Sequence, residues 1–157
     1  MPAFTQDEMQ ERIGRAVVKF IGVDRALIRL EANERTLTHK LAEYLQQEFP
    51  TWNVDCEYNR LGGDRKEIDL PEKYSTIDDE DLYATTVYPD IIIHKREQPY
   101  ENNLLVIEAK KQGNPRKDQE WDIVKLHHYK KTLRYEYALF VKFDEAHDPP
   151  VILQWIA

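Results

Sequence analysis

The sequence predicts an α/β fold in which a central mixed β-sheet is flanked by helices. Three stretches of the chain carry apolar residues at helical spacing, and segments with the alternating or continuous apolar pattern of strands lie between and after them. The chain has 157 residues, of which 41% are hydrophobic, enough to build one core. We therefore expect a single domain over residues 1–157.

The N-terminal part predicts two helices. Apolar residues at helical spacing favour an amphipathic helix over residues 5–21, which we expect to end near Gly22. A second, short helix is expected at residues 24–30. The apolar positions of the first helix are Met9, Ile13, Ala16, Val17 and Phe20.

A third helix and the first strand follow. Asn33 can cap a helix that runs to Glu48, and Pro50 ends it because the residue before a proline is disfavoured in helical geometry. Apolar and polar residues alternate over 52–58, the pattern of a half-buried strand. A polar, acidic loop at 61–85 comes next.

Two apolar strands are expected at about 86–95 and 103–110, joined by a turn that contains Pro99. Because this connection is short, the two strands are expected to pair antiparallel. The remaining elements are a helix at 118–134 and two strands at 135–143 and 151–156.

Charge is distributed unevenly along the chain. The net charge of −7 argues against a strong stand-alone nucleic-acid binder. Residues 61–85 hold eight acids and three bases, whereas residues 110–134 hold eight bases and three acids. The basic stretch leaves room for contact with phosphate, and the alternative is two solvated faces of opposite sign.

The sequence also indicates a compartment. It contains no run of 18 apolar residues, and its N-terminus is polar and acidic, so we expect neither a membrane span nor a signal peptide. Cys56 is the only cysteine and excludes an internal disulfide. These features favour a cytoplasmic protein without membrane contact.

Charged residues stand at the ends of the two apolar strands. Asp90 begins the first strand, Glu108 lies near the end of the second, and Lys110 follows two residues later. Antiparallel pairing brings Asp90 beside Glu108, and the strand period of two puts Lys110 on the same face as Glu108. Burying such charges is costly unless they are paired, and a bound metal and a phosphate would compensate them.

Carboxylate oxygens are the ligands that Mg²⁺ and Mn²⁺ prefer. An ion held by Asp90 and Glu108 would lower the pKa of water and polarise a phosphoryl oxygen. Lys110 would stabilise developing negative charge, or orient or deprotonate the nucleophile, and the sequence leaves these roles open. The pattern therefore favours hydrolysis of phosphodiester bonds.

Pro89-Asp90, followed after seventeen residues by Glu108-Ala109-Lys110, resembles the signature of the PD-(D/E)xK nuclease superfamily, which has the restriction-endonuclease-like fold. The resemblance implies that residues 33–143 form an αβββαβ core. Residues 1–30 are then an N-terminal helical extension and residues 61–85 an acidic insertion. The implied activity is Mg²⁺- or Mn²⁺-dependent cleavage of DNA, by an endo- or exodeoxyribonuclease.

The resemblance also implies further site residues. The backbone carbonyl of Ala109 joins the metal ligands, and an acid on the first core helix commonly does so. Glu34 is the candidate for that acid, with Glu31 as the weaker substitute. Alternatively, Glu34 only complements the helix dipole. Glu57 is either an extra ligand or an exposed strand acid.

Basic residues after the signature are candidates for binding DNA phosphates: Lys111, Arg116, Lys117 and Lys125. Asp122, Lys125 and Tyr129 share a stripe of the expected helix. In related nucleases this helix often supplies a polar residue, for which Lys125 or Tyr129 is suited. The alternative is a simple surface pair between Asp122 and Lys125.

The function expected from these patterns is a metal-dependent DNA nuclease of a defence, mobile-element or repair system. Its acidic net charge suggests weak intrinsic affinity for DNA, and hence a homodimer or a partner protein. One alternative is a non-catalytic module of the same fold that binds or regulates with a partner protein. Another is a small-molecule enzyme on an unrelated α/β fold.

Overall fold

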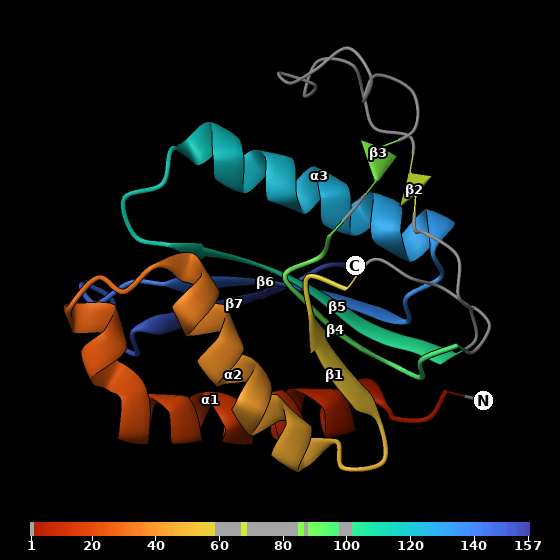
Figure 1. Cartoon of the computed structure of the whole chain (residues 1–157), viewed down its shortest axis with the longest axis horizontal. Coiled ribbons are helices and arrows are strands. Elements are labelled where there is room, and N and C mark those ends of the chain that lie inside the picture. The colour runs from red at the N-terminus through yellow and green to blue at the C-terminus, as the bar shows by residue number, and fades with distance from the viewer. Residues whose placement is uncertain (1, 59–66, 69–84, 87, 98–101) are drawn as a thin grey trace.

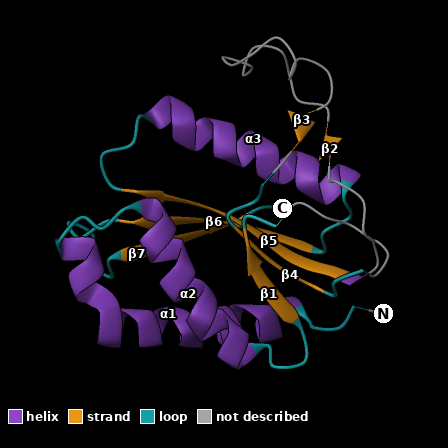
Figure 2. Cartoon of the chain, in the orientation of Figure 1, coloured by secondary structure: helices purple, strands orange, loops and turns teal. Residues whose placement is uncertain are grey.

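The structure is a computed structural model that describes residues 2–58, 67–68, 85–86, 88–97 and 102–157. The described chain forms a five-stranded sheet with α1 and α2 on one face and α3 on the other (Figures 1 and 2). This confirms the predicted central sheet flanked by helices. The elements are α1 (Gln6–Arg29), α2 (Glu34–Glu48), β1 (Asn53–Cys56), β4 (Ile91–His94), β5 (Asn103–Lys111), α3 (Arg116–Thr132), β6 (Tyr137–Phe143) and β7 (Val151–Trp155).

The sheet is mixed, as the sequence predicts, and its strand order is β1-β4-β5-β6-β7. The antiparallel pairing predicted for β4 and β5 is confirmed, and β5 pairs parallel with β6 across the connection through α3. Strands β1 and β7 form the edges, each antiparallel to its neighbour. Strand β5 therefore lies at the centre of the sheet, with a hydrogen-bonded neighbour on each side.

Helix α1 differs from the prediction because it does not end near Gly22. It continues to Arg29, through a kink at Asp24 where the backbone leaves helical geometry. The hydroxyl of Tyr44 on α2 donates to the Asp24 carboxylate, which fixes the kink to the neighbouring helix and raises the pKa of Tyr44 to about 12. The short helix expected at 24–30 is thus the second part of α1.

Helix α2 begins and ends as the sequence predicts. The side chain of Asn33 accepts a hydrogen bond from the backbone N–H of Thr36 at 2.8 Å, which satisfies one free donor of the first turn. The helix ends at Glu48, and Phe49 is its C-cap. This helix places Glu34 in its first turn, next to the end of β5.

The region between β1 and β4 is described only in part. Strand β2 (Glu67–Ile68) pairs antiparallel with β3 (Thr85–Thr86), so the predicted loop at 61–85 includes β-structure. The other residues of that loop, and the turn with Pro99, lie outside the described residues. The strand predicted at 86–95 is shorter than expected, because β4 begins only at Ile91.

Apolar side chains form two clusters rather than the single core that was expected. The larger cluster lies between the sheet and the helices α1 and α2, and the smaller one lies between the sheet and α3. Alternate residues of a strand point to opposite faces, so the apolar run of β5 contributes Ile107 to the first cluster and Val106 to the second. Glu108 and Lys110 follow Val106 at the same period and face α3.

Within the described part of the chain, no helix combines the length and the apolarity that crossing a lipid bilayer requires.

A partly buried ion pair joins β1 to the end of β4. The Asp55 carboxylate contacts Nε2 of His94 at 2.7 Å and accepts a hydrogen bond from Nε of Arg96 at 2.9 Å. Burial raises the pKa of Asp55, but the hydrogen bonds from His94 and Arg96 outweigh it, so the pKa falls to about 2. A depressed folded-state pKa means that this stabilisation exists above pH 3.8 and is lost as the pH falls toward 2.

Asp55→Asn should therefore lower the free energy of unfolding at pH 7 by on the order of 1 kcal/mol, because the ion pair is partly solvated. The difference between parent and variant should shrink between pH 4 and pH 2. Urea unfolding of parent and variant at pH 7, pH 4 and pH 2 checks this. The exposed Asp118→Asn is the control for loss of one acid. A difference that does not change with pH would mean that the charge of Asp55 is not what stabilises this edge.

Candidate active site

Asp90 and Glu108 lie together, as the strand pattern predicts. Asp90 directly precedes β4, and Ile91 pairs with Ile107, so continuation of the register puts Asp90 opposite Glu108. Their carboxyl groups are hydrogen-bonded to each other. Oδ2 of Asp90 also accepts the backbone N–H of Ala109 at 2.8 Å. Two adjacent strands thus fix the relative position of the two acids.

The environment of this pair favours one shared proton. Glu108 is 2% exposed, and burial raises its pKa well above the ordinary value although Lys125 opposes the shift. Burial also raises the pKa of Asp90, whereas the hydrogen bond with Glu108 lowers it. The same hydrogen bond raises the pKa of Glu108, so Glu108 is the member of the pair whose pKa lies further above its ordinary value. The hydroxyl of Tyr129 donates to Oε1 of Glu108 at 3.0 Å.

Lys110 contacts two acids from two different helices. Its ammonium nitrogen lies 3.1 Å from Oδ2 of Asp122 on α3 and 3.8 Å from Oε1 of Glu34 on α2. Burial lowers the pKa of Lys110, but Asp122 and then Glu34 outweigh it, so the pKa lies above its ordinary value. Lys110 is therefore a cation, held between the two layers of helices at the end of β5.

Asp122 and Lys125 form a pair within the site, so the alternative of a surface pair is wrong. Asp122 is fully buried, and its Oδ1 lies 3.1 Å from the ammonium nitrogen of Lys125. The same nitrogen lies 3.6 Å from Oε1 of Glu108. Burial lowers the pKa of Lys125, but Glu108 and Asp122 raise it by more than burial lowers it, so the ammonium group stays charged.

Asp122 is the site residue that the sequence did not single out. Its spacing from Lys125 fits an exposed ion pair equally well, and only its place in one stripe with Tyr129 pointed inward. In the structure Leu126 and Tyr129 pack against the sheet and carry Asp122 into the space above Lys110. The burial of this stripe is the signal that would have identified it.

Glu34 reaches the site and Glu31 does not. Oε2 of Glu34 accepts hydrogen bonds from the Asn114 side chain at 2.6 Å and from the backbone N–H of Lys111 at 3.4 Å. Glu31 lies before α2 and contacts the side chain of Gln112 at 3.5 Å. Of the two acids that the sequence left open, Glu34 is the one next to Lys110.

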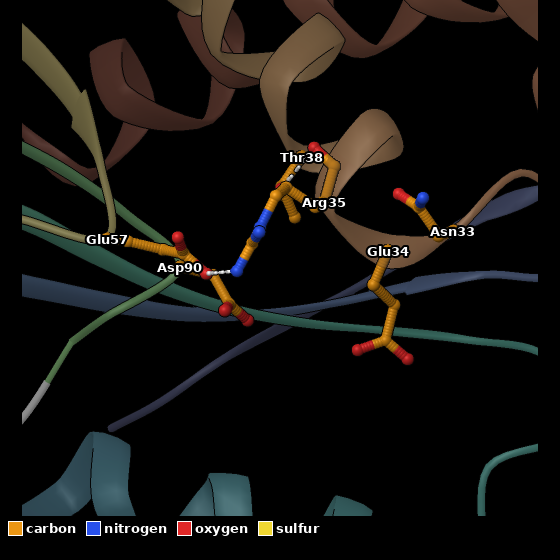
Figure 3. A pocket seen from close by; sticks show the side chains of 6 residues that line it. All are labelled: Asn33, Glu34, Arg35, Thr38, Glu57 and Asp90. Atoms are coloured by element: carbon orange, nitrogen blue, oxygen red, sulfur yellow. Dashed lines mark hydrogen bonds and ion pairs between the residues drawn. The ribbon is translucent and has the colours of Figure 1, made fainter.

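A pocket of about 370 Å³ opens beside Asp90. Figure 3 shows Arg35 reaching from α2 to Glu57 next to Asp90, and the two side chains form an ion pair of 3.3 Å. Glu57 is exposed, as one of the two predicted alternatives has it, but it lies one residue beyond β1. Its carboxylate is the counter-ion of an exposed arginine, and its backbone N–H donates to the carbonyl of Asp90 at 3.2 Å. The pocket is lined by Asn33, Glu34, Arg35, Thr38, Glu57 and Asp90.

The basic residues predicted to contact DNA fall into two groups. Arg116 and Lys117 are exposed in the first turn of α3, where Arg116 pairs with Glu120 at 3.1 Å, and Lys111 is half-buried at the end of β5. Lys125 differs from this expectation, because its side chain is only 21% exposed and faces Glu108. Lys125 belongs to the charged cluster of the site rather than to the outer surface.

The acids of the site outnumber its lysines. When all are ionised, the carboxyl groups of Glu34, Asp90, Glu108 and Asp122 exceed the ammonium groups of Lys110 and Lys125 by two. No three side chains of His, Cys, Asp or Glu are grouped as ligands of one ion among the described residues. Glu34 faces Lys110 and Asn114 instead, so ligation by Asp90, Glu108, the Ala109 carbonyl and Glu34 remains a prediction.

Comparison of the chain with protein-family models, with curated proteins and with solved structures found no match.

Proposed function

We propose that this protein is a Mg²⁺- or Mn²⁺-dependent nuclease that hydrolyses phosphodiester bonds of DNA. The observation that carries the proposal is the contact of Asp90 with Glu108 at the centre of the sheet, with Lys110 on the same face. Two carboxyl groups that share a proton in the absence of a cation are ready-made oxygen ligands once that proton leaves.

The order of elements supports the same proposal at the level of the fold. From α2 to β6 the described chain runs α2, β1, β4, β5, α3, β6, with the small β2–β3 pair inserted after β1. This order agrees with the αβββαβ core of the restriction-endonuclease-like fold. We propose that the chain has this fold, with α1 as an added helix that packs into the larger apolar cluster.

Asp90, Glu108, the backbone carbonyl of Ala109 and Glu34 are the proposed metal ligands. A bound Mg²⁺ or Mn²⁺ supplies Lewis acidity toward a phosphoryl oxygen and toward water. Glu108 must give up its proton, and Lys125 must give up part of its contact with Glu108, for these carboxylates to serve as ligands. Lys110 then stabilises negative charge at the attacked phosphate.

DNA is the proposed partner, and Lys111, Arg116 and Lys117 are the proposed contacts to its backbone. Arg116 and Lys117 are exposed at the start of α3, beyond the end of the strand that carries Glu108 and Lys110. The net charge of −7 implies weak affinity for DNA, which a homodimer or a partner protein would strengthen. Cleavage within a strand and cleavage from an end are both compatible with this site.

A non-catalytic module of the same fold, which binds or regulates with a partner protein, is the second candidate, and one observation favours it. Without a cation, every charged group of the site already has an opposite charge within 4 Å or a hydrogen bond to a neighbouring carboxyl. Such a closed network would also persist in a protein that keeps the fold and has no turnover.

Cleavage by the purified protein should require Mg²⁺ or Mn²⁺ and should stop when a chelator is added. Ca²⁺ should bind, since it also prefers oxygen ligands, yet support little cleavage. The assay is cleavage of linear and circular DNA after dialysis against chelator, with each cation added back. Undiminished cleavage in chelator would reject the metal mechanism, and no cleavage with any cation would favour the binding module.

A further inference from the structure

Asp122 is the most deeply buried charged group of the cluster, with no exposed surface. Its two oxygens each lie 3.1 Å from a different ammonium nitrogen, that of Lys110 and that of Lys125. Among the described residues, no backbone N–H, hydroxyl or amide group donates to either oxygen, so the two ammonium groups are the donors that Asp122 has. Two lysines alone thus pair with this buried carboxylate.

A buried carboxylate is costly, because it loses the donors that water would supply. Two nearby ammonium groups offset part of that loss. A protein that needed only a filled interior at this position would be as stable with an apolar residue, and often more stable. The arrangement therefore calls for a reason other than stability.

The metal ligands proposed above indicate what Asp122 does in the site. Of the four acids in the cluster, Glu34, Asp90 and Glu108 are proposed to bind the cation. Asp122 is the acid that remains for Lys110 and Lys125 once the others are engaged. Asp122 belongs to α3, whereas Asp90 and Glu108 lie on the sheet side of the site, so Asp122 holds Lys110 of β5 from the helix that covers this face.

We propose that Asp122 is a positioning residue that holds the ammonium group of Lys110 toward the attacked phosphodiester of the substrate. Lys125 is the second ammonium on the same carboxylate, and the two form a pair that faces the phosphate once the acids of the sheet bind the cation. This proposal rests on the proposed nuclease function. A lysine side chain has many rotamers, so a fixed counter-ion preserves the geometry on which its charge stabilisation depends.

The competing explanation is purely structural: Asp122 only neutralises the buried charge of Lys125. The variants that separate the two are Asp122→Asn, Lys125→Gln and the double variant with both changes. The double variant removes one negative and one positive charge, so the cluster keeps its net charge and the fold has no new charge imbalance. Asp118→Asn, one turn earlier on α3 and exposed, is the control for loss of an acid.

Two measurements are made on each protein. The first is the single-turnover rate of cleavage at saturating DNA with Mn²⁺, beside the affinity for the same DNA with Ca²⁺. The second is the rate at which Lys110 is acylated by an amine-reactive ester, measured by mass spectrometry of its peptide. The second measurement does not depend on catalysis.

Asp122→Asn is expected to slow cleavage by on the order of 100-fold while DNA affinity stays within about threefold, because position rather than binding is lost. Lys110 should be acylated several-fold faster than in the parent, since its closest counter-ion is gone. In the Lys125→Gln background the same change should slow cleavage by a similar factor. Asp118→Asn should behave as the parent does.

Cleavage and acylation that match those of Asp118→Asn would overturn the proposal. So would an Asp122→Asn change that has no effect in the Lys125→Gln background, because Asp122 would then only neutralise Lys125. If the parent protein cuts no DNA, the nuclease function fails, while faster acylation of Lys110 would still show that Asp122 holds it.

Discussion

Lys110→Met should reduce single-turnover cleavage by on the order of 1,000-fold while the affinity for DNA stays within a few-fold. The methionine keeps most of the unbranched side chain and removes the ammonium group, and Lys110 is too enclosed to contribute much to surface binding, since its side chain is 19% exposed. Cleavage and binding of the same DNA, with Mn²⁺ and Ca²⁺ respectively, measure the two effects separately. Arg96→Met, two residues after β4 and paired with Asp55, is a control for loss of a paired cation.

The opposite result is expected when Lys111, Arg116 and Lys117 are all changed to glutamine. Loss of these proposed contacts to the DNA backbone should weaken DNA binding and make that binding less dependent on salt. Turnover at saturating DNA should be retained. Normal cleavage by Lys110→Met would remove the most specific residue of the nuclease assignment. The binding module would then be the better description of the protein.

Glu108→Gln should strongly weaken metal binding and abolish cleavage, yet leave the metal-free protein at least as stable as the parent. The amide has the shape of the protonated carboxyl group, so it keeps donors toward Asp90 and an acceptor for the hydroxyl of Tyr129. It cannot act as an anionic ligand, so the affinity for Mn²⁺ should fall by on the order of 100-fold or more. Titration calorimetry with Mn²⁺ and thermal unfolding in chelator measure the two effects.

The difference in stability between the parent and Glu108→Gln should depend on pH. The folded-state pKa of Glu108 lies above its ordinary value of 4.5, so the folded protein holds the proton more tightly than the unfolded chain does. Stability of the metal-free parent should therefore fall as the pH rises from about 4.5 through the folded-state pKa. The glutamine variant should lack this loss, and a variant that is several degrees less stable at pH 8 would mean that a charged Glu108 stabilises the fold through Lys125.

The parts of the site that could be predicted from the sequence depend on local geometry. A short connection between two apolar strands requires antiparallel pairing, which brings Asp90 beside Glu108. The period of a strand places Lys110 on the same face as Glu108. Asn33 as a helix cap is equally local, and it sets the position of Glu34 in the first turn of α2.

What could not be predicted depends on packing between elements far apart in the sequence. Asp122 and Lys125 have the spacing of an exposed ion pair, and only the rotation of α3 on the sheet, set by Leu126 and Tyr129, turns them inward. The glycine at position 22 suggested a helix end. Packing of α1 on the sheet overrides that preference, since Phe20 before it and Ile28 after it are both buried.

The central place of β5 has a consequence for how the molecule fluctuates. Its amide protons from Leu105 to Ile107 belong to fully buried residues in a strand paired on both sides, so they should exchange with solvent only when the whole molecule opens. The edge strands β1 and β7 can open locally without disturbing that segment. Glu108 and Lys110 continue the same strand and stay paired with β6, so their spacing should survive the partial unfolding that frays the edges of the sheet.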